Sequence, residues 1–228
     1  MHHQHLAPVH PFERTLLVLL VSMVQGENVT SAMNVKMLNV SYNSPFWDML
    51  DQAIKLTQDM NGRISKLSTH FNGFYAKGRG FHNRIIRCHT SSLSRPENKE
   101  QAQNTGSEVL LKLARSLLQA WVNPLHHLWA EMGDKLGYTP YHLTKALEIK
   151  SINKKVLEAM KKIIREAKFA LEENVNAPVW SELASLQSTN RDTRYFAFYT
   201  LFRCLGSDSR DVEMYLKLVK CQKVQSNC

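Results

Sequence analysis

The chain has 228 residues, of which 43% are hydrophobic and 21% are charged, with nine glycines and seven prolines. This composition excludes collagen-like, low-complexity and broadly disordered chains, and it is typical of a globular protein with a sizeable core. The formal charge is +9, which attracts anionic partners such as heparan chains, membrane surfaces or nucleic acid without identifying one of them. The meaning of the four cysteines depends on the compartment.

The amino-terminal region predicts secretion. Ten apolar and uncharged residues at positions 15–24 are too few to span a bilayer, but they suit the hydrophobic region of a secretory signal peptide. Small residues at Val24 and Gly26 place the cleavage after Gly26, so residues 1–26 are the predicted signal peptide. The alternative is a buried amino-terminal core helix.

Removal of the signal peptide would leave a mature chain with two parts. We expect a flexible segment over 27–43 and a single domain over 44–228. Two Asn-x-Ser/Thr sequons, at Asn28 and Asn39, predict a glycoprotein. No other segment reaches membrane length, so the product is expected to be soluble, extracellular and monomeric, without membrane insertion.

On an oxidising path, the four cysteines indicate two disulfides, and the absence of any Cys-x-x-Cys pair weakens a metal site. Three pairings are possible. Cys221 and Cys228 are seven residues apart and can close a small local loop, which would leave Cys88 to pair with Cys204. A disulfide between Cys88 and Cys204 would close a long loop and would stabilise the fold by about 4–5 kcal/mol in the chain-entropy model.

Apolar residues recur at steps of three or four in four long segments, which predicts four amphipathic helices. The first covers about 45–74 and ends its apolar stripe at Phe74. The second covers about 107–137, where Gly133 and Gly137 end it, and Pro124 should kink it because proline lacks the backbone donor.

The third helix is expected over about 140–171, with Leu147 in its apolar stripe, and the fourth after Asn190. The first half of the fourth helix, 195–202, is apolar on nearly all sides and is therefore expected to be the most deeply buried segment.

The lengths of the connections predict how the helices are arranged. About 33 residues separate the first two helices and about 18 the last two, whereas the middle connection is short. Long connections can join parallel helices, and short ones join antiparallel neighbours. The prediction is an all-α, up-up-down-down four-helix bundle with two long crossovers, and with Cys88 in the first crossover.

Motifs for catalysis are missing from the sequence. It contains no nucleophile elbow, phosphate-binding loop, dinucleotide fingerprint or His-Glu-x-x-His pair. The adjacent His126 and His127 point about 100° apart on a helix and cannot share one metal. The histidines His2, His3 and His5 lie in the predicted signal peptide. We therefore expect neither an enzyme nor a cofactor or metal ion.

Basic residues form a positive flank on the third helix. An ordinary solvated face and a polyanion site, with heparan sulfate as the candidate, both fit this flank. No aromatic residues are interleaved with it, which argues against nucleic acid. The flank consists of Lys154, Lys155, Lys161, Lys162, Arg165 and Lys168.

Several segments carry a specific family resemblance. They are 88–96 (Cys-His-Thr-Ser-Ser-Leu-Ser-Arg-Pro), 99–103, 117–121, 123–128, 178–181, 185–187, 197–199 and 204–221. They resemble the prolactin and growth hormone family, and its prolactin branch most closely. The resemblance implies a secreted four-helix hormone of the up-up-down-down type, with Cys88 paired to Cys204 and Cys221 to Cys228.

The resemblance also implies receptor binding. In the family, one face formed by the first and fourth helices and the first crossover binds a class I cytokine receptor. A second face, between the first and third helices, binds another receptor chain, and bringing the two together starts Janus kinase/STAT signalling. By position, Arg210, Tyr215 and Lys217 belong to the first face. Equally, Tyr215 could be an aromatic residue at the bundle edge and Lys217 a solvated side chain.

Several positions depart from the family pattern. Gln58 and Asn61 replace histidines of the first helix, and Arg210-Asp211 replaces a histidine-lysine pair, which puts zinc- or pH-assisted binding in doubt. Ala159 replaces a glycine that opens the second receptor cleft. An amino-terminal cysteine pair is also absent. These departures indicate a divergent, prolactin-related hormone such as the placental ones.

Two functions are therefore open. The favoured one is a secreted hormone that binds and activates a prolactin-type receptor. The alternative is a secreted binding protein of the same fold that does not activate this receptor and acts through another partner or a glycosaminoglycan.

Overall fold

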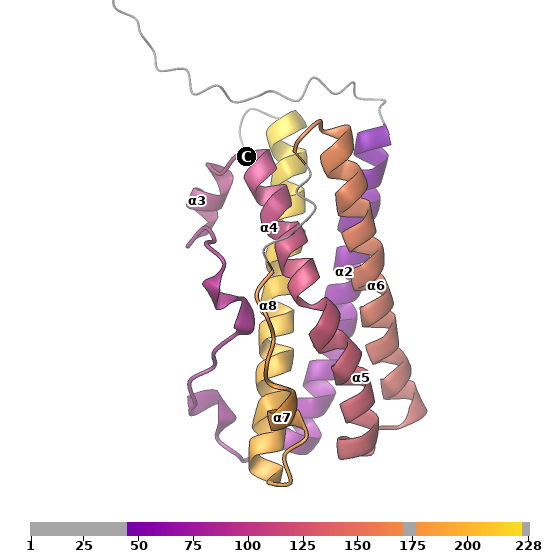
Figure 1. Cartoon of the computed structure of the whole chain (residues 1–228), viewed down its shortest axis with the longest axis vertical. Coiled ribbons are helices and arrows are strands. Elements are labelled where there is room, and N and C mark those ends of the chain that lie inside the picture. The colour runs from indigo at the N-terminus through magenta and orange to yellow at the C-terminus, as the bar shows by residue number, and fades with distance from the viewer. Residues whose placement is uncertain (1–44, 171–176, 225–228) are drawn as a thin grey trace, which may run out of the picture. The chain divides into compact units, whose positions relative to one another are not determined.

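The computed structural model describes residues 45–170 and 177–224, and its long helices follow the apolar periodicity of the sequence (Figure 1). Two shorter helices lie in the long connections, and neither described range contains a strand. The helices are α2 (Pro45–Phe71), α3 (Lys99–Gln103), α4 (Ser107–Ala120), α5 (Val122–Leu136), α6 (Pro140–Glu166), α7 (Leu183–Leu186) and α8 (Arg191–Val224).

The long helices form an up-up-down-down bundle, as predicted. In Figure 1, α2 and the α4–α5 pair run in one direction, and α6 and α8 run in the other. Helix α2 packs against both α6 and α8, and α4 packs against the same two helices, so antiparallel helices are neighbours. The first crossover, between α2 and α4, contains α3, and the second, between α6 and α8, contains α7.

The core is one cluster of apolar side chains contributed by all the long helices. Between α2 and α8 it is aromatic. Phe71 is fully buried, and its ring lies 5.4 Å from the Phe202 ring and 6.0 Å from the Phe198 ring. Aromatic side chains bury a large apolar area and prefer specific ring geometries. These rings therefore stabilise the packing of α2 against α8 in one register.

The predicted break in the second helix occurs at Trp121, between α4 and α5. Pro124 lies within the first turn of α5 and has no backbone N–H, so it cannot donate to the carbonyl of Ala120 four residues earlier. The regular helix is interrupted there, and the carbonyl of Ala120 is left for another donor.

Some details of the helices differ from the predictions. Phe74 is 74% exposed, because the chain widens into a π-helical turn at Asn72–Ala76 that ends the regular periodicity of α2. Leu147 is 42% exposed, since the buried stripe of α6 passes through Ala146 and Ile149 instead. Gly133 lies inside α5, which ends only at Gly137.

The third and fourth helices also differ from expectation. Helix α6 ends at Glu166, four to five residues before the predicted end near 171. Segment 195–202 is not buried throughout, since Phe198 and Phe202 are in the core but Tyr195 and Phe196 are only half-buried. Phe196, but not Tyr195, lines a cavity of about 300 Å³ that lies beside the two crossovers.

The disulfide between Cys88 and Cys204 is present, as predicted, and ties the first crossover to α8. Cys221 is disulfide-bonded as well, but its predicted partner Cys228 lies outside the described residues, as do the signal peptide and the sequons at Asn28 and Asn39. Within the described ranges, no helix combines the length and the apolar character that crossing a bilayer requires.

Candidate functional site

The face shared by α2 and α8 contains a polar cluster centred on Glu213. Gln58 Nε2 and Asn61 Nδ2 of α2 donate to the Glu213 carboxylate at 3.3 and 2.6 Å. Lys217, one turn further along α8, donates to the same carboxylate at 2.5 Å. The structure therefore brings three of the predicted site residues together around one carboxylate that the sequence analysis did not select.

The electrostatics of this cluster favour the ionised carboxylate. Burial by itself would raise the pKa of Glu213, but hydrogen bonds from Lys217, Asn61 and Gln58 outweigh it and hold the pKa below its usual value. The spacing of four residues between Glu213 and Lys217 is the sequence signal that could have identified the pair.

Arg210 of α8 is the other basic residue of this face. It is exposed, and its guanidinium lies beside Gly206 and close to Ile64 of α2. A Cβ atom built at Gly206 would lie 3.5 Å from Arg210 Nη1 and 3.7 Å from Ile64 Cγ2. The absence of a side chain at Gly206 thus lets the Arg210 guanidinium lie against the helix surface, next to α2.

Tyr215 is only 1% exposed and lies in the core rather than on the outer face. Burial and the nearby Asp211 charge raise the pKa of its phenol to about 12, so it stays protonated at physiological pH. Of the three residues that the resemblance places on the fourth-helix surface, only Arg210 and Lys217 are accessible to a partner in this conformation.

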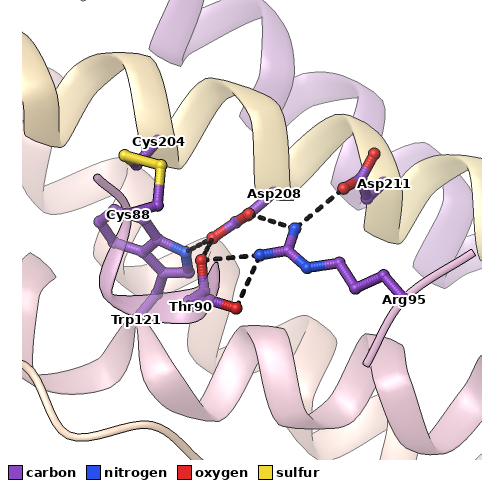
Figure 2. Close-up of a disulfide and its surroundings, with 7 residues drawn as sticks. All are labelled: Cys88, Thr90, Arg95, Trp121, Cys204, Asp208 and Asp211. Carbon is purple, nitrogen blue, oxygen red and sulfur yellow. Dashed lines mark hydrogen bonds and ion pairs between the residues drawn. A yellow bond between two sulfur atoms is a disulfide. The ribbon is translucent and has the colours of Figure 1, made fainter. Parts of the chain in front are cut away.

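Asp211 points toward the first crossover, where it meets Arg95 (Figure 2). Arg95 Nη1 donates to Asp211 Oδ2 at 3.0 Å and to Asp208 Oδ1 at 2.7 Å. Arg95 Nη2 donates to the backbone carbonyl and the hydroxyl of Thr90, both at 2.9 Å. One guanidinium therefore joins the crossover to two carboxylates of α8.

Asp208 is the buried centre of this arrangement, with 2% of its surface exposed. Besides Arg95, its carboxylate accepts hydrogen bonds from Thr90 Oγ1 at 2.7 Å and from Trp121 Nε1 at 2.8 Å. Because a buried carboxylate is stable only when it is paired and hydrogen-bonded, these three donors explain why it is tolerated in the core.

The pKa shifts follow from this geometry. Burial raises the pKa of Asp211 and the Asp208 charge adds to the rise, while Arg95 only partly offsets it. Burial alone would lower the pKa of Arg95, but the two carboxylates outweigh burial and raise it. The cation is therefore permanent, and the network holds one surplus carboxylate.

A second contact ties the same crossover to the helix break. His89 Nε2 lies 3.2 Å from the carbonyl oxygen of Ala120, the group that Pro124 leaves without its helical donor. A carbonyl can only accept, so Nε2 carries the proton. Burial lowers the pKa of His89, which keeps the ring neutral. The disulfide, Arg95 and His89 together hold the crossover against α8, α4 and α5.

The face between α2 and α6 has a different character. Arg63 of α2 donates to Asp59 at 2.9 Å and pairs with Glu148 of α6, which Lys145 also reaches at 3.0 Å. A groove of about 700 Å³ lies beside this cluster, between α2 and the start of α6. Ala159 is half-buried further along α6 and does not line this groove.

Metal binding has no support in the described ranges, because they contain no group of three or more histidine, cysteine or carboxylate side chains that could hold an ion. The surfaces outlined above offer hydrogen bonds, charges and apolar edges to a partner. Such groups suit macromolecular recognition, and they lack the convergent reactive set that catalysis requires.

A bundle of four long helices in up-up-down-down order, with two long crossovers, defines the class of four-helix-bundle cytokines. The model of the somatotropin hormone family matches residues 18–228, so the chain belongs to the somatotropin/prolactin family of hormones and is not an enzyme. The mouse (Mus musculus) protein Prolactin-4A1 is 61% identical over 215 residues, which cover 94% of this chain and 95% of the relative.

Proposed function

We propose that the chain is a secreted hormone that binds a prolactin-type class I cytokine receptor and signals through receptor dimerisation and Janus kinase/STAT. Family membership and the extensive identity to a protein named Prolactin-4A1 support this proposal. Secretion rests on the predicted signal peptide over 1–26 and on the family, whose hormones are secreted.

The observation that carries the proposal is the polar cluster around Glu213. Gln58 and Lys217 are exposed, and Asn61 is half-buried. All three are held in place by hydrogen bonds to a single carboxylate across α2 and α8. A preordered face of this kind binds with a smaller loss of side-chain entropy than a set of freely rotating side chains. Arg210 extends it by a second cation.

The test is binding to the purified prolactin receptor ectodomain, with stoichiometry measured by light scattering. A complex of one hormone with two receptors supports signalling, and no binding at micromolar concentration would refute the proposal. Replacing both exposed cations, in Arg210→Ala/Lys217→Ala, should weaken binding about tenfold, chiefly through slower association. The matched control is Lys112→Ala, because Lys112 is also in an i,i+4 ion pair, with Glu108 of α4.

The second receptor is tested separately. If the methyl group of Ala159 hinders close docking at the second face, Ala159→Gly should favour the complex with two receptors over the complex with one. An unchanged ratio would exclude Ala159 from this role.

A second candidate function is a secreted binding protein of the same fold that does not activate this receptor and acts through another partner or a glycosaminoglycan. It is supported by the pairing of Asp211 with Arg95 and by the burial of Tyr215, because both side chains are then less available to a receptor. A stable 1:1 complex without phosphorylation of STAT in receptor-expressing cells would favour this candidate.

A further inference from the structure

The carboxy-terminal half of α6 carries an exposed row of cations on one side. On an α-helix, residues seven and eleven positions apart lie within about 20° of each other around the axis, so Lys154, Lys161 and Arg165 lie in line, about 16 Å from end to end at 1.5 Å per residue. Lys155 and Lys162 flank this line on one side. The opposite side of the helix holds the core residues. We name the following residues the α6 basic stripe: Lys154, Lys155, Lys161, Lys162, Arg165 and Lys168.

Most of this charge has no internal partner. Lys161 pairs with Glu158 at 2.8 Å, but Lys154, Lys155 and Lys162 form no ion pair with any residue that the structure describes. The hydrogen bond from Lys161, with the nearby charges of Lys154 and Lys162, holds the pKa of Glu158 below its usual value. Between 154 and 168, six cations face only two carboxylates.

Lys168 provides a second and independent observation. It directly follows the C-cap of α6, with a φ of 57°, and it is the only residue other than glycine with a positive φ in the described ranges. Its N–H donates to Arg165 O, and the N–H of Phe169 donates to Ile164 O, which is the Schellman arrangement that normally takes glycine. Helix α5 ends on Gly137, with a φ of 62°.

A lysine in this conformation is strained, since its Cβ crowds the backbone where glycine would not. The side chain is exposed, and it forms no hydrogen bond or ion pair with any residue in the described ranges that would offset the strain. The chain thus keeps a cation at the end of the basic stripe at a cost in stability. Residues held in such conformations against local preference are a recognised sign of function.

We infer that the α6 basic stripe is a binding site for a linear sulfated polysaccharide of the heparan sulfate type. An extended row of cations matches a polymer with repeating anionic groups better than it matches a single small anion. The large apolar residues that are exposed on α6, Tyr141 and Leu147, precede the stripe, so it lacks the apolar side chains that insert into a membrane surface. The inference rests on the proposed secretion but not on receptor binding.

The test uses the full secreted chain and immobilised heparin as the probe, with affinity measured between 0.05 and 0.3 M NaCl, on the order of physiological screening. Replacement of three stripe residues in Lys154→Gln/Lys162→Gln/Arg165→Gln should weaken binding about tenfold or more. It should also reduce the slope of log Kd against log salt by about two, since fewer counterions are released. Glutamine keeps the helix propensity of the original residues.

A control variant distinguishes binding at the α6 basic stripe from a general effect of the net charge. The variant Lys55→Gln/Lys77→Gln/Lys99→Gln removes the same charge from exposed lysines on α2 and in the first crossover, and it should weaken binding less than about threefold. Equal loss in both variants would overturn the inference. So would equally tight binding to vesicles containing phosphatidylserine, or to hyaluronan, which has carboxylates but no sulfates.

Lys168→Gly offers the sharpest single test. The variant should melt at a higher temperature and bind heparin more weakly, a combination that an unfolded or damaged protein cannot produce. Unchanged heparin affinity in a stabilised variant would exclude Lys168 from the site. Receptor binding measured on the same variants shows whether the proposed hormone function stands independently of the polysaccharide site.

Discussion

Arg95 of the first crossover is bound to Asp211 of α8, with 3.0 Å between Arg95 Nη1 and Asp211 Oδ2. Asp211 occupies a position where the resemblance implied a basic residue at the receptor face. The reversed charge is therefore engaged by a cation within the molecule, although Arg95 also pairs with Asp208. It strengthens the attachment of the crossover, since the same guanidinium also binds the buried Asp208.

Removal of the Arg95 cation should strongly destabilise the fold. In Arg95→Met, Asp208 keeps two neutral donors but loses its counter-charge in a buried position, and the free energy of unfolding should fall by about 3–5 kcal/mol. Urea denaturation measures the change. In the double variant Arg95→Met/Asp208→Asn, much of the loss should be recovered, because the most deeply buried carboxylate is removed together with its counter-charge; an additive loss would contradict the pairing.

The histidine contact predicts an interaction between two distant positions. His89→Phe removes the donor to Ala120 O while keeping a ring against Trp121, and it should cost about 1–2 kcal/mol of unfolding free energy. In a Pro124→Ala background the helix supplies its own donor to that carbonyl, so the same substitution should cost about 1 kcal/mol less. Equal costs in both backgrounds would show that the carbonyl does not depend on His89.

The two helix ends with positive φ make a matched pair. Lys168→Gly should raise the free energy of unfolding by about 1 kcal/mol, because it relieves the left-handed strain. At the equivalent position of α5, Gly137→Lys should lower it by about the same amount. Thermal denaturation of both variants provides the comparison, and opposite signs are the expected result.

The Glu213 cluster predicts a pH dependence with a definite sign. The folded-state pKa of Glu213 lies below the usual value of 4.5, so its ionised form stabilises the fold above pH 4.5. This contribution is lost as the pH falls through the lower folded-state value. The difference in unfolding free energy between the wild type and Glu213→Gln should therefore shrink from pH 6 to pH 3, on the order of the range that carboxylates titrate. A constant difference would contradict the hydrogen-bonded cluster.

Apolar periodicity and the lengths of the connections predicted the bundle and its order, because both depend on features that are local in the sequence. The N-cap at Asn190, whose side chain accepts from the N–H of Thr193 at 3.0 Å, and the break before Pro124 were equally local. The exposure of Phe74 was not predictable in this way, since a π-helical turn interrupts the periodicity there.

The candidate site was less predictable than the fold. The resemblance selected Gln58, Asn61 and Lys217 but not the carboxylate that joins them, which lies about 150 residues away from α2 in the sequence. For Tyr215 the sequence left two equal interpretations, a residue of the receptor surface or an aromatic residue at the bundle edge. In the structure its side chain is buried in the core. Position in a helix defines a direction around its axis, but only the neighbouring helices decide whether that direction meets solvent.

Apolar periodicity, the lengths of the connections and the four cysteines were sufficient for the class of fold, the order of the helices and the pairing of Cys88 with Cys204. Only the folded chain showed that Asp211 pairs with Arg95, that Pro124 leaves a carbonyl for His89, and that Lys168 occupies a position suited to glycine. The physical reason is the distance along the sequence between the residues that interact. Helices and turns follow from neighbours in sequence, whereas the burial of a charge and its partner depend on segments brought together by packing.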